Sequence, residues 1–375
     1  MGAIQAGGGM EAGPLKVVIA GGGTGGHLFP GIAVARALQA RLPEAQISFA
    51  GTARGIEARV VPREGFPLDL IRIGGVKGKS IAAKVRGAAL VPIGLLDAWR
   101  IVSARRPSLV IGVGGYSAGP VVLVAALRGI PTLLLEQNAV PGLTNRLLAP
   151  FVRAAAVSFE STAPFFGAKA FVSGNPIRPE FLSVTAAVPS REKSPETKLL
   201  VFGGSQGAHA INAAMIDAAG ELMIRVSDVR LTHQTGEGDF SRVREAYRNA
   251  GLSAEVAPFF DDLPSRLART DLVICRAGAT TLAEITAVGA CAILVPLPTA
   301  TDDHQRKNAE TLAAAGAADV LLQSDLNGHT LVERVARLAA DGEARTRMSK
   351  AARALGRPAA AAAIVDRVLA LVGHG

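Results

Sequence analysis

The amino-acid sequence predicts an α/β protein that is built from two doubly wound parallel-sheet domains. Short apolar segments alternate with helical patterns along the whole chain, and the pattern starts again near residue 199. Each half also opens with a glycine-rich turn between a strand and a helix. The chain has 375 residues, enough for two domains that each bury a core. Because ligands of such sheets bind beyond the carboxyl ends of the strands, we expect the domains to face a common cleft.

The predicted strands are short apolar runs followed by turns. In the first half they are Val17–Ala20, Ile47–Phe49, Leu109–Val113, Thr132–Leu135 and Ala155–Val157. In the second half they are Leu199–Phe202, Val229–His233, Leu272–Cys275 and Ala292–Val295. Runs of this length and composition are typical of strands buried in a parallel sheet.

The same patterns divide the chain into four parts. Residues 1–14 are expected to form a flexible Gly-rich leader, because they have neither the basic start nor the apolar core of a signal peptide. A Gly/Pro-containing linker at residues 174–179 separates a first domain, residues 15–173, from a second domain, residues 174–354. Residues 355–375 are expected to form a C-terminal helix.

The composition restricts the classes of partner. A net charge of +9 and a pI of about 10.1 favour phosphate esters, anionic lipid or nucleic acid. Only 4% of the residues are aromatic, which argues against nucleic acid because few rings are available for base stacking. No apolar segment reaches the roughly 20 residues that span a bilayer, so we expect a soluble or peripheral protein. Cys275 and Cys291 lack metal-ligand spacing and are expected to be reduced core residues.

The first glycine-rich turn, Gly21–Gly26, is followed by His27 and by a helical pattern that starts at about Leu28. Glycines let phosphate or sugar oxygens approach the backbone, and the start of a helix presents N–H groups to them. A histidine there is disfavoured as a cation by the helix dipole, and a neutral imidazole can act as a general base. A tight turn with a surface histidine is the simpler alternative. A dinucleotide site is less favoured, because no acid follows the second strand before Glu57.

Two turns of the second half are candidates for binding a diphosphate. Gly203–Gly207 resembles a phosphate cradle to which Ser205 could donate its hydroxyl, although a plain strand-to-helix turn is the alternative. Ala279–Thr281 is expected to open a helix whose amides face a diphosphate. Glu284 then lies about one turn further on, where it could accept ribose hydroxyls or merely complement the helix dipole.

Two further loops follow predicted strands. The loop at residues 112–120 should open on the same side as the first glycine turn, and the polar loop at residues 302–309 could read sugar hydroxyls. Asp303 and His304 have no third ligand at a suitable spacing, so we expect no metal site.

The segment 72–100 combines basic and apolar residues. Its basic residues before Asp97 are Arg72, Lys77, Lys79, Lys84 and Arg86. The interleaved apolar residues are Ile73, Val76, Ile81, Val85, Leu90, Val91, Ile93, Leu95, Leu96 and Trp99. This pattern is typical of a surface that binds anionic lipid, to which each basic residue contributes roughly 1 kcal/mol. An ordinary helix with solvated charges is the alternative.

The ordered set of motifs resembles the MurG family of peptidoglycan glycosyltransferases from about Leu15 to the C-terminus. The motifs lie at residues 22–30, 114–116, 136–138, 174–178, 203–207, 276–284 and 304–309. The resemblance implies the GT-B fold, in which residues 174–354 bind UDP-N-acetylglucosamine and residues 15–173 bind the lipid acceptor at an anionic membrane surface. It also implies that the C-terminal helix packs back on the first domain.

Specific roles follow from this resemblance. His27 would be the catalytic base, the backbone of Phe260 would hold uracil, and Glu284 would hold the ribose. The diphosphate would bind Ser205, Arg178 and the helix start, and Gln305 would bind the donor sugar. The expected contacts along that helix are Ala279, Thr280, Thr281, Leu282 and Ala283, of which Thr280 departs from the apolar residue more common in the family. Thr24, Gly25, Gly26 and Asn138 would complete the site.

The activity implied is an inverting transfer of N-acetylglucosamine to the 4-hydroxyl of the muramyl unit of the undecaprenyl-linked pentapeptide, lipid I, without metal or cofactor. It would take place at the cytoplasmic face of the bacterial inner membrane. A UDP-N-acetylglucosamine 2-epimerase of the same fold is the alternative, but it would leave the basic apolar segment 72–100 without a purpose. A non-enzymatic membrane or nucleic-acid binding protein would explain the charge but not the glycine loops and His27.

Overall fold

The computed structural model describes residues 13–74, 90–186, 196–204, 207–226 and 228–373. The chain divides into two compact units. The first contains the residues up to Leu135 together with Leu147–Ala154 and Val365–Gly375. The second contains Glu136–Arg146 and Ala155–Ile364. The predicted leader, residues 1–14, lies outside the described residues up to residue 12.

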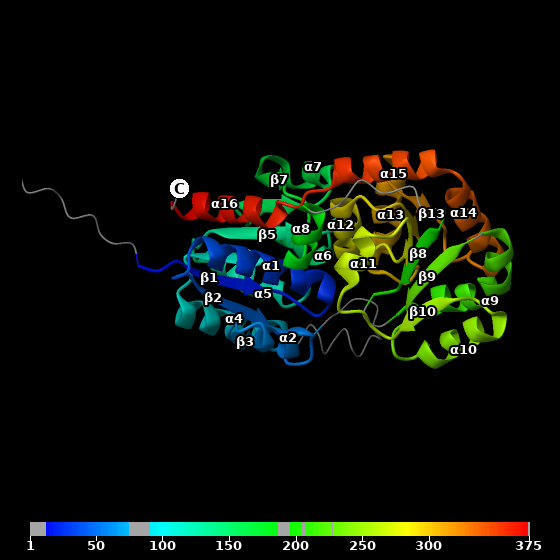
Figure 1. Cartoon of the computed structure of the whole chain (residues 1–375). Helices are drawn as coiled ribbons and strands as arrows, with labels where there is room; N and C mark the ends of the chain where they lie inside the picture. Colours follow the sequence, from blue (N-terminus) through cyan, green and yellow to red (C-terminus); the bar gives the residue numbers. More distant parts are fainter. Residues whose placement is uncertain (1–12, 75–89, 187–195, 205–206, 227, 374–375) are drawn as a thin grey trace, which may run out of the picture. The chain divides into compact units, whose positions relative to one another are not determined.

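The first sheet has seven strands in the order β3-β2-β1-β4-β5-β6-β7. Figure 1 labels β1, β2, β3, β5 and β7. The strands are β1 (Lys16–Ala20), β2 (Gln46–Gly51), β3 (Leu68–Leu70), β4 (Leu109–Gly112), β5 (Thr132–Glu136), β6 (Ala154–Val157) and β7 (Ala170–Val172). The accompanying helices are α1 (Gly25–Arg41), α2 (Glu57–Arg63), α4 (Val91–Arg105), α5 (Ala118–Leu127), α6 (Leu143–Leu148) and α7 (Ala163–Phe166). Strand order reverses between β1 and β4, which pair in parallel, so the loops that follow these two strands flank the switch point where doubly wound sheets bind ligands.

The second sheet has six strands in the order β10-β9-β8-β11-β12-β13. The strands are β8 (Thr197–Phe202), β9 (Val229–Gln234), β10 (Ala254–Ala257), β11 (Leu272–Cys275), β12 (Ala292–Leu294) and β13 (Asp319–Val320). Its helices are α8 (Pro179–Ala186), α9 (His209–Arg225), α10 (Phe240–Ala250), α11 (Leu263–Ala268), α12 (Ala279–Val288), α13 (His304–Ala314), α14 (Gly328–Ala340) and α15 (Gly342–Leu355). Here the switch point lies between β8 and β11, which also pair in parallel. Two doubly wound parallel sheets confirm the predicted fold class.

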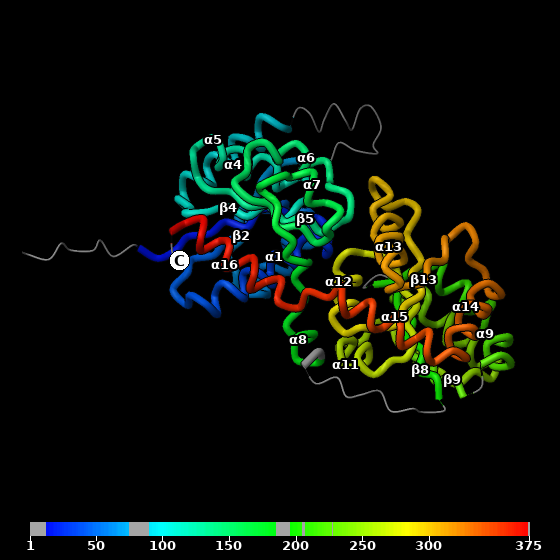
Figure 2. The backbone as a smooth tube through the Cα atoms, turned by 90° about the horizontal axis from the view of Figure 1, so that it is seen from above, coloured from blue at the N-terminus to red at the C-terminus, as the bar shows by residue number. Residues whose placement is uncertain are grey.

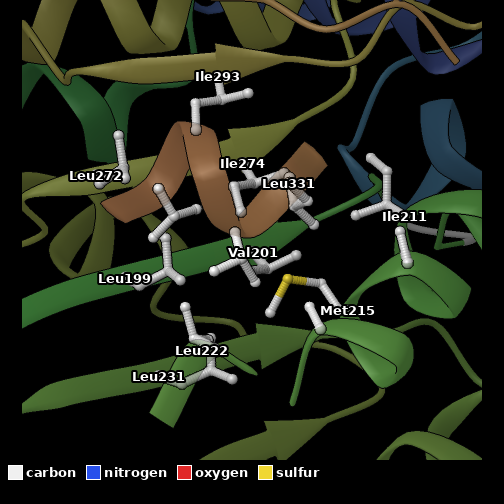
Figure 3. Close-up of a cluster of buried hydrophobic side chains, with 14 of the residues drawn as sticks. Leu199, Val201, Ile211, Met215, Leu222, Leu231, Leu272, Ile274, Ile293 and Leu331 are labelled. Atoms are coloured by element: carbon white, nitrogen blue, oxygen red, sulfur yellow. The ribbon is translucent and has the colours of Figure 1, made fainter. Parts of the chain in front are cut away.

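The core of the second unit lies on both faces of this sheet. Helices α9 and α14 pack side by side on one face (Figure 2). Figure 3 shows the side chains between them and the strands, which are Leu199, Val201, Ile211, Met215, Leu222, Leu231, Leu272, Ile274, Ile293 and Leu331. The alternate residues Leu200, Phe202 and Val273 face a second cluster with Ile285 of α12. Because the strands are buried on both faces, truncating one such leucine or isoleucine to alanine typically costs about 2–5 kcal/mol.

Both cysteines are reduced thiols, and both are buried, as predicted. Cys275 ends β11, and burial raises the pKa of its thiol.

Two predicted helix boundaries were wrong. Helix α1 begins at Gly25 rather than near Leu28, because the amide of Leu28 already donates to the Thr24 carbonyl at 3.1 Å and closes the first turn. The C-terminal helix α16 (Ala360–Val372) begins five residues after Leu355, where α15 ends. Pro358 lies between the two helices and has no N–H to continue α15. The part of α16 from Val365 onward counts with the first unit.

Candidate active site

The first glycine loop follows β1 and packs against the loop that follows β4. Gly21, Gly22 and Gly23 all have positive φ angles, 140°, 144° and 84°. A Cβ on Gly21 would lie 2.4 Å from the carbonyl oxygen of Gly114, and one on Gly115 would lie 2.6 Å from the carbonyl oxygen of Gly22. Only glycines permit this approach. The prediction that the loop at residues 112–120 opens beside the first glycine loop is therefore confirmed.

His27 is the third residue of α1. Its Nδ1 lies 3.3 Å from Oγ1 of Thr24, the residue that precedes the helix. A Cβ on Gly114 would lie 2.8 Å from Cδ2 of His27, so the imidazole rests directly on the Gly114 backbone. Thr24 and Gly26 are exposed, and Gly25 is half-buried. Gly25, Gly26 and the predicted base His27 therefore form the first turn of one helix, and Thr24 directly precedes it.

The carboxylate of Glu57 lies behind this loop and is fully buried. It accepts hydrogen bonds from the amide of Gly23 at 2.7 Å, the amide of Thr52 at 2.9 Å and the hydroxyl of Thr52 at 2.8 Å. Burial raises the pKa of Glu57, but these donors together lower it more, so its pKa lies below the usual value. Sequence reasoning considered Glu57 only as an acid too far along to bind a ribose, and it missed this role.

The second glycine loop follows β8, and Gln234 at the end of β9 holds it. Nε2 of Gln234 donates to the carbonyl of Gly204 at 3.1 Å, and Oε1 accepts from the amide of Phe260 at 2.9 Å. One buried amide thus joins the loop expected to bind a diphosphate to the segment expected to bind uracil. Ser205 lies outside the described residues. Sequence reasoning missed Gln234, although a polar residue at the carboxyl end of a buried strand was a usable signal.

A buried histidine supports the end of β9. His233 Nε2 lies 3.1 Å from Oδ1 of Asn212, and its Nδ1 lies 2.7 Å from the hydroxyl of Tyr247. Asn212 donates its own amide protons to the carbonyl of Thr235 and to Asp239, so its Oδ1 accepts from Nε2–H of His233. Nδ1 then accepts from Tyr247. Burial lowers the pKa of His233 to about 3, which keeps the ring neutral.

Glu284 and Arg178 contact each other. Glu284 lies in the second turn of α12 and is buried, and its Oε1 accepts from Nε of Arg178 at 3.1 Å. The guanidinium also lies over the ring of Phe181 at 5.0 Å. Burial raises the pKa of Glu284 to about 7, even though Arg178 lowers it. The residues expected to hold ribose and diphosphate therefore form an ion pair.

The start of α12 fulfils the expectation of a helix at Ala279. The residue before the helix is Gly278, which has no side chain that could accept a hydrogen bond from the first amides. The first amides of a helix lack partners within it, so Ala279, Thr280 and Thr281 face the position where an anion is favoured. Oγ1 of Thr280 is buried and has no hydrogen-bond partner among the described residues. Leu282 is buried in the core, so it can offer a ligand only its backbone.

Gln305 lies in the first turn of α13. Its Oε1 accepts from the amide of Leu297 at 3.0 Å and from the amide of Ala277 at 3.3 Å. Both bonds orient the side chain so that Nε2, a donor, is its remaining hydrogen-bonding group. A sugar hydroxyl could accept from it.

Asn138 is held by two neighbours. Its Oδ1 accepts from Nδ2 of Asn308 at 3.1 Å, while Oδ1 of Asn308 accepts from the amide of Ala139 at 2.8 Å. The buried carboxyl of Glu136 accepts from the amide of Asn138 at 3.0 Å, and burial raises the pKa of Glu136. Residues of two sequence motifs thus fix Asn138: Glu136 of its own motif, residues 136–138, and Asn308 of the motif at residues 304–309.

Helix α4 exposes apolar side chains. Val91, Ile93, Leu96 and Trp99 are 40%, 37%, 46% and 55% exposed. Arg72 is bound by Asp97 at 2.7 Å, so this basic residue is neutralised by its partner. Seven other members of the predicted segment lie outside the described residues: Val76, Lys77, Lys79, Ile81, Lys84, Val85 and Arg86. Within the described part of the chain, no helix has the length and apolar character needed to cross a bilayer.

Both halves of the chain match known domains. Residues 17–157 match the glycosyltransferase family 28 N-terminal domain, and residues 198–364 match the C-terminal domain of the same family. A relative from Pelobacter propionicus is 46% identical over 95% of this chain and 99% of its own length. One from Myxococcus xanthus is 45% identical over 94% of this chain and 92% of its own. Both are named UDP-N-acetylglucosamine–N-acetylmuramyl-(pentapeptide) pyrophosphoryl-undecaprenol N-acetylglucosamine transferase.

Solved structures agree with this assignment. The crystal structure of Acinetobacter baumannii MurG is 32% identical, matches 95% of this chain and all of its own, and has a TM-score of 0.80. A UDP-GlcNAc 2-epimerase from Neisseria meningitidis has a TM-score of 0.65 at 13% identity, which shows the shared fold alone. The chain therefore belongs to glycosyltransferase family 28 and, within it, to the MurG group that its motifs resemble.

Proposed function

We propose that the chain transfers N-acetylglucosamine from UDP-N-acetylglucosamine to the 4-hydroxyl of the muramyl unit of undecaprenyl-pyrophosphoryl-MurNAc-pentapeptide. The observation that carries the proposal is the match of nearly the whole chain, at 46% identity, to relatives named for this transfer. The reaction inverts the anomeric carbon, because an α-linked donor gives a β-linked product in one in-line displacement.

The donor would bind beyond the carboxyl ends of β8 and β11. The backbone of Phe260 would hold uracil, and Glu284 would accept the ribose hydroxyls. Arg178 would then exchange Glu284 for the diphosphate, next to Ser205 and the amides of the α12 start at residues 279–283. Gln305 would donate Nε2 to the sugar, a role supported by the two backbone amides that fix its Oε1.

His27 would act as the base, and Thr24, Gly25, Gly26 and Asn138 would complete the acceptor side. As the 4-hydroxyl oxygen attacks the anomeric carbon, His27 takes its proton. The bond from that carbon to the UDP oxygen breaks, and the negative charge that develops on UDP is stabilised by Arg178 and by the N-terminus of α12. A positioned base typically contributes about 10²–10⁴-fold to the rate.

We also propose that residues 15–173 form the acceptor domain and residues 174–354 the donor domain, with the C-terminal helix packed on the first. The exposed apolar side chains of α4 support binding to a membrane surface, and the net charge of +9 favours an anionic one. We place the protein at the cytoplasmic face of the inner membrane.

Transfer of labelled sugar tests the function. Label should move to a short-chain lipid-linked muramyl-peptide only when that acceptor is supplied, and a chelator should not change the rate. Release of UDP or epimerised sugar without acceptor would instead establish the epimerase alternative.

A further inference from the structure

We propose that Glu57 is a positioning residue for the transfer, because its carboxylate fixes the glycine loop from which α1 and His27 start. The proposal rests on the function given above. It concerns a residue that touches neither substrate in that scheme and acts through the geometry of the base.

Both oxygens of Glu57 are used, and they join two loops. Oε2 accepts from the amide of Gly23, 34 residues earlier, at 2.7 Å. Oε1 accepts from the amide and the hydroxyl of Thr52, at 2.9 and 2.8 Å. The same hydroxyl accepts from the amide of Gly55 at 3.1 Å. The loop after β1 is thereby tied to the loop after β2 through one side chain.

Three glycines make room for this carboxylate. A Cβ on Gly22 would lie 2.6 Å from Cδ of Glu57, and one on Gly51 would lie 2.5 Å from Cγ. A Cβ on Gly55 would also overlap Oε2. Any side chain at these positions would push the carboxylate out of place. The glycine-rich character of this region thus serves a buried acid as well as the approach of a ligand.

The carboxylate also completes the start of α1. The helix has no side-chain cap of its own and no acidic residue in its first turn. Glu57 supplies a negative charge two residues before the helix begins, at the amide of Gly23. Because that amide already binds an internal anion, it does not serve a phosphate. The loop resembles a dinucleotide cradle in sequence, but its Gly23 amide orients the first turn and its histidine.

The test compares Glu57→Gln with Glu64→Gln. The glutamine keeps the size of the side chain but turns an NH₂ group toward amide donors, so kcat should fall about tenfold to a hundredfold. The KM for UDP-N-acetylglucosamine should stay within about twofold, because the donor binds the second unit. Glu64 is a matched control: it pairs with Arg36 at 3.0 Å on the surface, and its variant should keep the wild-type kcat.

Two measurements separate positioning from general damage. In a His27→Ala background, Glu57→Gln should cost less than about twofold in kcat, because its effect passes through the histidine. The NMR signals of the labelled His27 imidazole should shift in Glu57→Gln and not in Glu64→Gln. If Glu57→Gln does not fold, Thr52→Val removes the hydroxyl donor and should give an intermediate loss of kcat.

Wild-type kcat in Glu57→Gln, or an equal loss with and without His27, would overturn the proposal. A wild-type protein that transfers no sugar would overturn the function instead. In that case the His27 signals still decide, because an unchanged spectrum in Glu57→Gln contradicts positioning whatever the reaction.

Discussion

The two glycine loops occupy equivalent places in their sheets but are anchored by opposite chemistry. The first follows β1, and a carboxylate, Glu57, accepts from its amide. The second follows β8, and an amide, Gln234, donates to its carbonyl. A carboxylate places negative charge behind the loop and occupies an N–H group, whereas a neutral amide adds no charge. The difference between the anchors, rather than the number of glycines, therefore supports the proposal that the second loop, and not the first, receives a diphosphate.

Other groups in each unit are consistent with this difference between the two anchors. In the second unit, Arg178 and the N-terminus of α12 provide positive charge for an anion. Beside the first loop, the imidazole of His27 rests on Gly114. These contacts support the proposal that the second loop receives the leaving group and that the first loop carries the base.

Replacing His27 by alanine should have the largest effect. It removes the proposed proton acceptor while leaving the second unit intact, so turnover should fall about 10²–10⁴-fold and the affinity for UDP should stay unchanged. Single-turnover transfer and calorimetric UDP titration measure the two quantities. An equal collapse of UDP binding would show that His27 is structural, and the contrast between the loops would fail.

Gln234→Glu gives the second loop the anchor of the first. A carboxylate oxygen would then face the Gly204 carbonyl, 3.1 Å away in the present contact, and would repel a diphosphate. UDP affinity should fall about tenfold or more, which corresponds to about 1.4 kcal/mol. Gln39→Glu, at an exposed position on α1, adds the same charge and should bind UDP normally. Normal UDP binding by Gln234→Glu would contradict the claim that the charge of the anchoring side chain affects diphosphate binding at the second loop.

The sequence predicted the central strands and missed the edges. Each strand predicted from an apolar run is present. Within the described residues four strands were missed, β3, β7, β10 and β13, and they are the edge strands of the two sheets. Central strands are buried on both faces and therefore consist of apolar residues. The edge strands are short and mixed, such as Leu68–Leu70 and Asp319–Val320, so nothing in their composition separates them from loops.

The same limit applies to the site. The glycine turns, Glu284 and Gln305 could be found because they follow predicted strands or open helices. Glu57 and Gln234 could not be assigned their roles, because their partners are brought close only by tertiary pairing. Gly23 lies 34 residues from Glu57, and Phe260 lies 26 residues from Gln234.

Donor binding should depend on the ionisation of Glu284. Burial raises its pKa to about 7, and the ionised form accepts ribose hydroxyls better than the acid does. The affinity for UDP-N-acetylglucosamine should therefore rise with pH and be about tenfold weaker at pH 6 than at pH 8. Titration calorimetry across this range measures it, and Glu284→Gln should give weak, pH-independent binding. The same pH dependence in the variant would assign the titration to another group.

As the pH falls, the stability that His233 contributes beside the second loop should decline before the stability that Glu57 contributes at the first loop. This is the smallest of the expected effects. The pKa of His233 is lowered from 6.5 to about 3 by burial, so the stability contributed by its neutral form is present above pH 6.5 and is lost as the pH falls toward 3. The limiting slope is about 1.4 kcal/mol per pH unit. The pKa of Glu57 is lowered from 4.5, so its contribution declines only below that value.

Thermal unfolding of the wild type and of His233→Gln between pH 5 and pH 8 isolates this effect. The raised pKa of Glu284 contributes stability that is lost as the pH rises from 4.5 to about 7. Both proteins contain Glu284, so this contribution cancels in the difference between their stabilities. The stability advantage of the wild type should shrink as the pH falls below 6.5, because only the wild type must bury a ring that takes up a proton when unfolded. A stability difference that stays constant across this pH range would mean that His233 is solvated in the folded protein. The hydrogen bonds of His233 with Tyr247 and Asn212 would then not be needed to position Gln234 at the end of β9.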